Sequence, residues 1–271
     1  CGGTETTIRA RRGVVLATGG FEWDEELKTT FLRGPLTSPA SPPTNTGDGL
    51  KMALTAGAGL GNMTSAWWIP TLSESGARWP DNGAPEKDAQ RSVPVLIERT
   101  LPHSLMVNGQ GKRFCNEATN YSALAGAFHS FDPATYGYNN LPAYLIVDSQ
   151  YRGRYPIASV MPGDPSPDWI VEAPDLAGLA DAIGVDATQL EATVSRFNTH
   201  AENVNDPDFG RGVSAYDRFY GDRSRDGAAA TLGKVEVGPF FAVRIDLGAL
   251  GTNGGPRTNG MAQVLNVYGE V

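Results

Sequence analysis

The sequence has few residues that could form covalent or metal cross-links. Its two cysteines, Cys1 and Cys115, exclude a disulfide framework and a cysteine-rich zinc site. Its three histidines lack a ligand-like spacing, so we expect no metal. No apolar run approaches the roughly 20 residues of a membrane span, and no signal-peptide pattern is present. The net charge of −8 argues against a nucleic-acid partner. The small number of cysteines also suits the reducing environment of the cytoplasm.

Apolar patterns and turn residues predict a chain of mixed α and β structure. The β-branched run at 13–17 predicts a strand buried on both faces. Further strands are expected at 93–97, 104–107, 143–147 and 240–245, and a hairpin turn at 108–109. Helices are expected at 24–31, 48–56 with Asp48 as N-cap, 175–183, 186–202, and from near Tyr121. Loops are expected at 35–43 and at 63–93, the second anchored by Trp67, Trp68 and Trp79.

Glycine is in excess, with 33 of 271 residues, and it gathers where strands end or helices begin. Three such segments are 17–21 (ATGGF), 44–49 (TNTGDG) and 251–255 (GTNGG). Backbone amides at these turns can approach a nucleotide or a flavin ring because no Cβ intervenes. Each segment alone also suits an ordinary turn, and Asp48 suits a helix cap. Together they favour a cofactor site, although no Gly-x-Gly-x-x-Gly pyrophosphate motif follows an N-terminal strand.

Several stretches resemble a known flavoprotein superfamily. Residues 14–21 (VVLATGGF), 46–49 (TGDG) and 109–117 (GQGKRFCNE) are similar to two flavin-contacting elements and the cap-domain signature of fumarate reductases and succinate dehydrogenases. Within that superfamily, four stretches resemble the 3-ketosteroid Δ1-dehydrogenase (3-oxosteroid 1-dehydrogenase) branch: 66–70, 98–102, 214–222 and 250–255. The resemblance covers nearly the whole chain, which looks like an internal part without the N-terminal FAD motif and the C-terminal segment of that family.

The resemblance implies an α+β cap (catalytic) domain inserted in an α/β Rossmann-like FAD-binding domain, of which only parts are present. Residues 1–82 would belong to the FAD-binding domain, 83–247 to the cap with its substrate site, and 248–271 to the return into the FAD-binding domain. The implied cofactor is FAD. The residues expected to bind it are Ala17, Thr18, Gly19, Gly20, Phe21, Asn45, Thr46, Gly47, Asp48, Gly251, Thr252, Gly254 and Gly255.

The implied reaction introduces a carbon-carbon double bond next to the ketone of a 3-ketosteroid. A base removes the α-proton and the flavin accepts a hydride. By position in the family the base is Tyr121, which otherwise would pack at a helix start. Because a tyrosine ordinarily has a pKa of about 10, this role needs a neighbour that stabilises phenolate, or a proton relay. We expect that neighbour to lie in the N-terminal part of the family that this chain lacks. The expected steroid contacts are Ile97, Tyr144 and Ile146.

Other residues have structural interpretations. Asn116 and Glu117 are expected to fix the cap loop by hydrogen bonds, and the 216–222 run to be a pinned loop. Trp67 and Trp68 either pack at the domain junction or stack on the steroid.

The fumarate reductase pattern is altered at two places that favour a large neutral substrate. Its His-Pro-Thr stretch is replaced by residues 68–71 (WIPT), and Thr252 stands where it has a histidine before the return glycines. Three alternatives stay open: 4-ene instead of Δ1 dehydrogenation, another FAD-dependent or fumarate reductase-like dehydrogenase, and a non-catalytic fragment unable to hold FAD alone. The preferred steroid and the electron acceptor stay undefined, and the apolar substrate allows association with a membrane.

Overall fold

The computed structural model describes residues 7–74 and 91–271. The α-helices are α1 (Glu25–Phe31), α2 (Asp48–Thr55), α3 (Ala125–Phe128), α4 (Ser149–Arg152), α5 (Leu176–Ile183), α6 (Ala187–Glu202) and α7 (Ala215–Phe219). Two 3-10 helices are η1 (Glu98–Thr100) and η2 (Gly227–Ala230). The strands are β1 (Leu60–Gly61), β2 (Ala66–Glu74), β3 (Arg91–Pro94), β4 (Ser104–Asn108), β5 (Phe131–Asp132), β6 (Gly137–Tyr138), β7 (Ala143–Asp148), β8 (Ile170–Ala173), β9 (Phe240–Thr252) and β10 (Gly255–Pro256).

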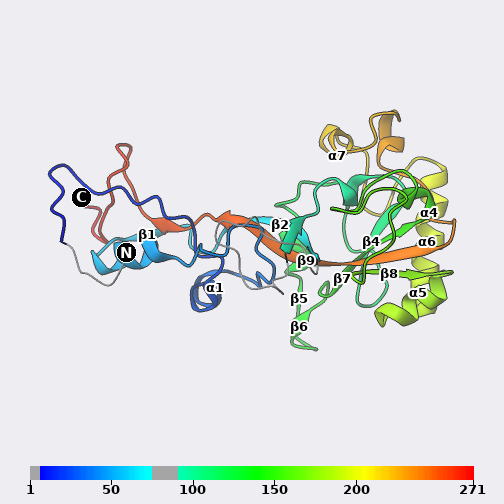
Figure 1. Ribbon diagram of the computed structural model, residues 1–271, viewed down its shortest axis with the longest axis horizontal. Coiled ribbons are helices and arrows are strands. Elements are labelled where there is room, and N and C mark those ends of the chain that lie inside the picture. Colours follow the sequence, from blue (N-terminus) through cyan, green and yellow to red (C-terminus); the bar gives the residue numbers. More distant parts are fainter. Residues whose placement is uncertain (1–6, 75–90) are drawn as a thin grey trace.

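Two long antiparallel strands, β2 and β9, run through the centre of the molecule. Figure 1 shows β2 and β9 running from one end, where α2, β1 and the C-terminal residues lie, towards the other, where α4 to α7 gather. Around them a six-stranded sheet has the order β3-β2-β9-β7-β4, and β8 also pairs with β9. The sheet therefore connects the segment with the glycine turns to the segment with the helices.

The sheet has an apolar core on each face, because side chains of successive strand residues point to opposite sides. On β7, Leu145 and Val147 belong to one core, together with the segment around α3. Ile146 belongs to the other core, where α5 and α6 cover the sheet. No helix among residues 7–74 and 91–271 is both long and apolar enough to cross a membrane.

The helix boundaries follow local signals in the sequence. Asp24, Asp175 and Asp186 each accept a hydrogen bond from a backbone amide in the first turn of α1, α5 and α6, as N-caps do. Gly184 ends α5 in the left-handed conformation with φ of 73°. The expected N-cap at Asp48 was wrong by one residue. Gly47, with φ of 75°, occupies the N-cap, and Asp48 is the first helical residue.

Three expectations about the remaining segments were wrong. Residues 13–17 form no strand; no strand in the described chain pairs with them, and Val14 and Val15 are 78% and 90% exposed. The expected loop at 63–93 contains β2, whose Pro70 and tryptophans obscured a strand pattern; Trp79 lies outside the described residues. The strand expected at 240–245 continues as β9 to Thr252, through glycines that seemed to end it. The expected turn at 108–109 is confirmed: the chain reverses there, and Val107 forms an antiparallel bridge with Arg113.

Candidate flavin and proton-transfer site

The three glycine turns predicted from the sequence meet at one buried carboxylate. Glu22 is fully buried and accepts a hydrogen bond from Asn45 Nδ2 at 2.7 Å and from the amide of Thr252 at 3.2 Å. Thr252 Oγ1 accepts a hydrogen bond from the amide of Phe21 at 3.1 Å. These hydrogen bonds hold the turns 17–21, 44–49 and 251–255 next to one another.

Some glycines in these turns are needed for packing and others leave the surface open. A Cβ on Gly20 would lie 2.2 Å from Glu22 Oε2, and one on Gly19 would lie 2.4 Å from Asn45 Oδ1. A Cβ on Gly251 or Gly255 would meet no protein atom within 4 Å. The first pair lets the turns approach one another. The second pair leaves bare backbone that a flat ring can contact, so these residues fit a flavin.

The other predicted cofactor residues divide between surface and core. Ala17, Thr18 and Gly19 are exposed, so their backbone is accessible to a ligand. Thr18 Oγ1 also accepts a hydrogen bond from the amide of Gly49 at 3.0 Å, which joins the first turn to the second. The side chain of Phe21 is 1% exposed and packs in the core, so only its backbone faces the cluster.

Three further members have structural contacts within the turns. Gly47 is buried, and its amide donates to the carbonyl of Gly20 at 3.0 Å. Asp48 is exposed and accepts a hydrogen bond from Thr46 Oγ1 at 3.2 Å. Gly254 packs against Met63, whose Cα would lie 2.6 Å from an added Cβ.

Tyr121 contacts the end of β2 through a side-chain hydrogen bond. The indole Nε1 of Trp67 donates to the Tyr121 hydroxyl oxygen at 3.0 Å. Trp67 is 52% exposed, whereas the next residue, Trp68, is 1% exposed and packs edge-on against His129. The two tryptophans therefore differ: Trp68 is a core residue, and Trp67 is a polar contact of the predicted base.

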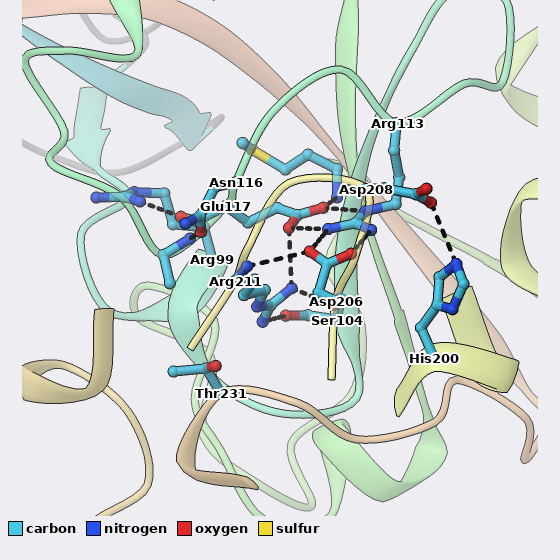
Figure 2. Close-up of polar contacts among 12 residues, drawn as sticks. Arg99, Ser104, Arg113, Asn116, Glu117, His200, Asp206, Asp208, Arg211 and Thr231 are labelled. Carbon is cyan, nitrogen blue, oxygen red and sulfur yellow. Dashed lines mark hydrogen bonds and ion pairs between the residues drawn. The ribbon is translucent and has the colours of Figure 1, made fainter. Parts of the chain in front are cut away.

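The loop that leads to Tyr121 is fixed by buried ion pairs. Figure 2 shows Glu117 between Arg113 and Arg211. Its carboxylate lies 2.7 Å from Arg113 Nη2 and 3.2 Å from Arg211 Nη1, and it accepts from the amide of Met106 at 3.1 Å. Burial alone would raise the pKa of Glu117, but the two arginine charges outweigh it and lower the pKa to about 2. The expectation that Glu117 fixes this loop is confirmed.

A third arginine fixes the backbone closer to Tyr121. Arg99 of η1 is fully buried; it donates to the carbonyl of Thr119 at 3.0 Å and to that of Glu117 (Figure 2). Burial lowers the pKa of Arg99 to about 10, a value that leaves it charged near neutral pH. The segment between Glu117 and Tyr121 is thus held from two sides.

Helix α7 is attached to the same loop. Asn116 Nδ2 donates to Asp217 Oδ2 at 3.0 Å, and Asp217 also accepts from the amide of Gly212 at 3.0 Å. At the end of the run, Asp222 accepts a hydrogen bond from Tyr155 at 2.6 Å and pairs with Arg154 at 2.8 Å. These contacts confirm Asn116 as a loop-fixing residue and 216–222 as a pinned segment.

The predicted substrate residues are not brought together around Tyr121. Ile97, just before η1, is 50% exposed and available to a ligand. Ile146 is fully buried in the core with α5 and α6, and Tyr144 packs against that core and donates to the carbonyl of Ile183 at 3.2 Å. Both lie on the sheet face opposite the core that contains Leu124 and Phe128, near Tyr121.

Two important residues carried no signal that sequence reasoning used. Glu22 lies two residues after the glycine pair, and in the sequence it looks like an ordinary exposed acidic residue of a surface turn. The Trp67 hydrogen bond joins residues 54 positions apart. Both residues acquire their contacts only in the folded chain, from partners that are distant in sequence.

The fold and the tied glycine turns define a flavin-binding protein, and comparison with known proteins agrees. Residues 2–271 match the FAD binding domain family, so the chain belongs to that family and its cofactor is FAD.

Three relatives show where in that family the similarity is strong. The chain is 44% identical to 4-oxocyclohexanecarboxylate 2-dehydrogenase of Sinomonas cyclohexanicum, over 97% of this chain and 44% of the relative. It is 41% identical to 3-oxosteroid 1-dehydrogenase of Mycolicibacterium smegmatis, over 93% and 43%. The structure of 3-ketosteroid Δ1-dehydrogenase from Sterolibacterium denitrificans, in complex with 1,4-androstadiene-3,17-dione, matches with a TM-score of 0.86 and 34% identity, over 99% of this chain and 47% of that one. The chain thus spans less than half of the length of each relative.

Proposed function

We propose that the protein to which this chain belongs is an FAD-dependent oxidoreductase that introduces a double bond next to the ketone of a 3-ketosteroid. The observation that carries the proposal is the proximity of two elements along β2. Trp67 contacts Tyr121, and the preceding residue Ala66 pairs with Thr252, which belongs to the glycine turn 251–255. With Tyr121 as proton acceptor and the flavin at the glycine turns, the two groups that take up the proton and the hydride would lie near one another, as dehydrogenation of a carbon-carbon bond requires. Similarity to 3-oxosteroid 1-dehydrogenases supports the substrate class.

In the proposed mechanism the residues of this chain bind and orient the flavin and the substrate, and one of them removes a proton from the substrate. FAD, when bound, supplies the acceptor for the hydride and its two electrons. The Tyr121 oxygen, as phenolate, takes the α-proton that the neighbouring ketone acidifies, and the remaining electron pair forms the double bond as the hydride leaves the adjacent carbon. The backbone of 17–19, Gly251 and Gly255 would hold the flavin, and Glu22 would fix those turns relative to one another.

The domain division is part of the proposal. Residues 1–82 and 248–271 would contribute to the FAD-binding domain, and 83–247 to a cap that is inserted into it. The gathering of α4 to α7 at the end away from the glycine turns supports this division (Figure 1). The second boundary would fall inside β9, so the two domains would share a continuous strand. Ile97 would contact the steroid, because its side chain is half exposed and it directly precedes η1, whose Arg99 is bonded to the backbone near Tyr121.

One relative favours a second substrate class. The 44% identity to 4-oxocyclohexanecarboxylate 2-dehydrogenase suggests a small cyclic ketone that carries a carboxylate. The bond chemistry is the same, and the substrates differ in size and charge. Trp68 and Ile69 stand where the resemblance puts the dicarboxylate-binding stretch of fumarate reductases, and both are buried apolar residues, so this stretch offers no cationic group to a carboxylate.

The proposal is tested with the flavin-loaded gene product and an artificial electron acceptor. We expect androst-4-ene-3,17-dione to reduce the dye and give the 1,4-diene, and 4-oxocyclohexanecarboxylate to react at least tenfold less well in kcat/KM. Preference for the carboxylate would replace the steroid assignment with the second substrate class. Failure of both ketones would contradict the proposed reaction.

A further inference from the structure

Trp67 is placed to act on the Tyr121 oxygen itself. Its indole Nε1 lies 3.0 Å from that oxygen, and the side chain is half exposed, so the contact is not a consequence of core packing. An indole N–H can donate a hydrogen bond and cannot accept one. We propose that Trp67 is a positioning residue that holds the Tyr121 oxygen and stabilises the negative charge it carries as a base. This inference rests on the proposed function and gives the tyrosine base a phenolate-stabilising donor within this chain.

The donor-only chemistry of indole has two consequences. A donor to the tyrosine oxygen is retained and strengthened when that oxygen becomes a phenolate, because charge-assisted hydrogen bonds are stronger than neutral ones. In the neutral tyrosine the hydroxyl proton must point away from Trp67, since the indole offers it no acceptor. The proton taken from the substrate therefore leaves Tyr121 by a route other than Trp67.

The charged and titratable groups around Tyr121 come from three elements. Tyr216 of α7 faces the Tyr121 backbone, and burial raises the pKa of Tyr216, so it stays neutral at the pH where a base works. Arg99 of η1 donates to the backbone carbonyls of Glu117 and Thr119. The carboxylate of Glu117 forms ion pairs with Arg113 and Arg211. Within the described residues, the hydrogen bond that reaches the Tyr121 oxygen comes from Trp67.

The strand geometry around Trp67 connects the base to the flavin-facing turn. Ala66 pairs with Thr252 and Trp68 with Ala249, so two residues of β9, Leu250 and Gly251, lie opposite Trp67 alone. Such a bulge changes the local twist and the direction of nearby side chains, and bulges are frequent next to active sites. Thr252 is also bonded to Glu22 and Phe21. One strand pair thus sets the position of the Tyr121 oxygen relative to the flavin-facing turn.

The test is Trp67→Phe, which removes the N–H donor and keeps an aromatic ring. We expect kcat to fall roughly tenfold with KM little changed, and the pH at half-maximal kcat to rise by about one unit, the equivalent of a tenfold change. In a Tyr121→Phe background the same substitution should have no further effect on the rate, because Trp67 acts through Tyr121. Trp169→Phe is the matched control, since Trp169 packs against the core and is not bonded to Tyr121; it should leave the pH profile unchanged.

A second measurement separates this inference from the proposed function. The ultraviolet pH titration of wild type minus Tyr121→Phe isolates the ionisation of Tyr121 without any turnover. The same difference, measured between Trp67→Phe and the Trp67→Phe/Tyr121→Phe double variant, should have a midpoint about one pH unit higher. Trp67→Leu replaces Trp67→Phe if that variant does not fold. An unchanged midpoint would overturn the role of Trp67 even if the enzyme oxidises ketosteroids. A raised midpoint would support it even if no ketosteroid is oxidised.

Discussion

The carboxylate of Glu22 accepts a hydrogen bond from the backbone amide of Thr252 at 3.2 Å, across 230 residues of sequence. Glu22 is fully buried and also holds Asn45, so one side chain connects all three glycine turns. A buried carboxylate that accepts several hydrogen bonds orients its donors, and its removal leaves those donors without a partner.

Glu22→Ala should therefore weaken FAD binding. Each hydrogen bond to a buried charge is worth about 1.5–3 kcal/mol, so we expect the Kd for FAD to rise at least roughly tenfold. Fluorescence titration of the flavin-free protein measures this. Glu25→Gln, at an exposed acidic residue of α1, is the control and should leave Kd unchanged. Equal FAD affinity in Glu22→Ala would show that the three turns do not form the flavin site.

Gly251→Ala tests whether the open glycine surface is a ligand surface. A Cβ there meets no protein atom within 4 Å, so the stability of the flavin-free protein should change by less than about 0.5 kcal/mol. If a flavin contacts this backbone, the methyl group should obstruct it and raise the Kd for FAD about tenfold. Gly260→Ala, also open but outside the cluster, should affect neither quantity. Unchanged FAD affinity in Gly251→Ala would remove that residue from the site.

The ion pairs of Glu117 predict a particular dependence of stability on pH. Its pKa is lowered from 4.5 to about 2 in the folded chain, so the unfolded chain binds the proton more readily. The resulting contribution to the free energy of unfolding is fully present above pH 4.5 and is lost as the pH falls from 4.5 towards 2. It amounts to about 3 kcal/mol. The carboxyl ¹³C shift of Glu117, followed by NMR, should remain that of a carboxylate at pH 4. Titration near pH 4.5 would contradict the role of Arg113 and Arg211.

The sequence predicts local features of this fold well. Asp175, Gly184 and Asp186 bound α5 and α6 as expected, because caps and stop residues act within one turn of their own position. The strand β2 was missed because Pro70 and adjacent tryptophans give no alternating pattern, and its pairing with β9 depends on residues far away in sequence.

The candidate site could be predicted only in part, for the same reason. The glycine turns are local signals, and the structure brings them together as predicted. Glu22 and Trp67 acquire their significance from partners 230 and 54 residues away. The face to which Ile146 points depends on strand register, since a shift by one residue reverses every side chain. Residue type alone could not reveal that Ile146 lies beneath α5 and α6.

The central claim is that Tyr121 removes the proton while flavin held by the glycine turns accepts the hydride. The most direct measurement is anaerobic mixing of the flavin-loaded protein with androst-4-ene-3,17-dione, followed by bleaching of the oxidised flavin absorbance. We expect rapid bleaching in wild type. In Tyr121→Phe, with equal flavin content, it should be slower by a factor of about 10² to 10⁴, the contribution of a general base. Bleaching at the same rate in Tyr121→Phe, or no bleaching in wild type, would contradict the account.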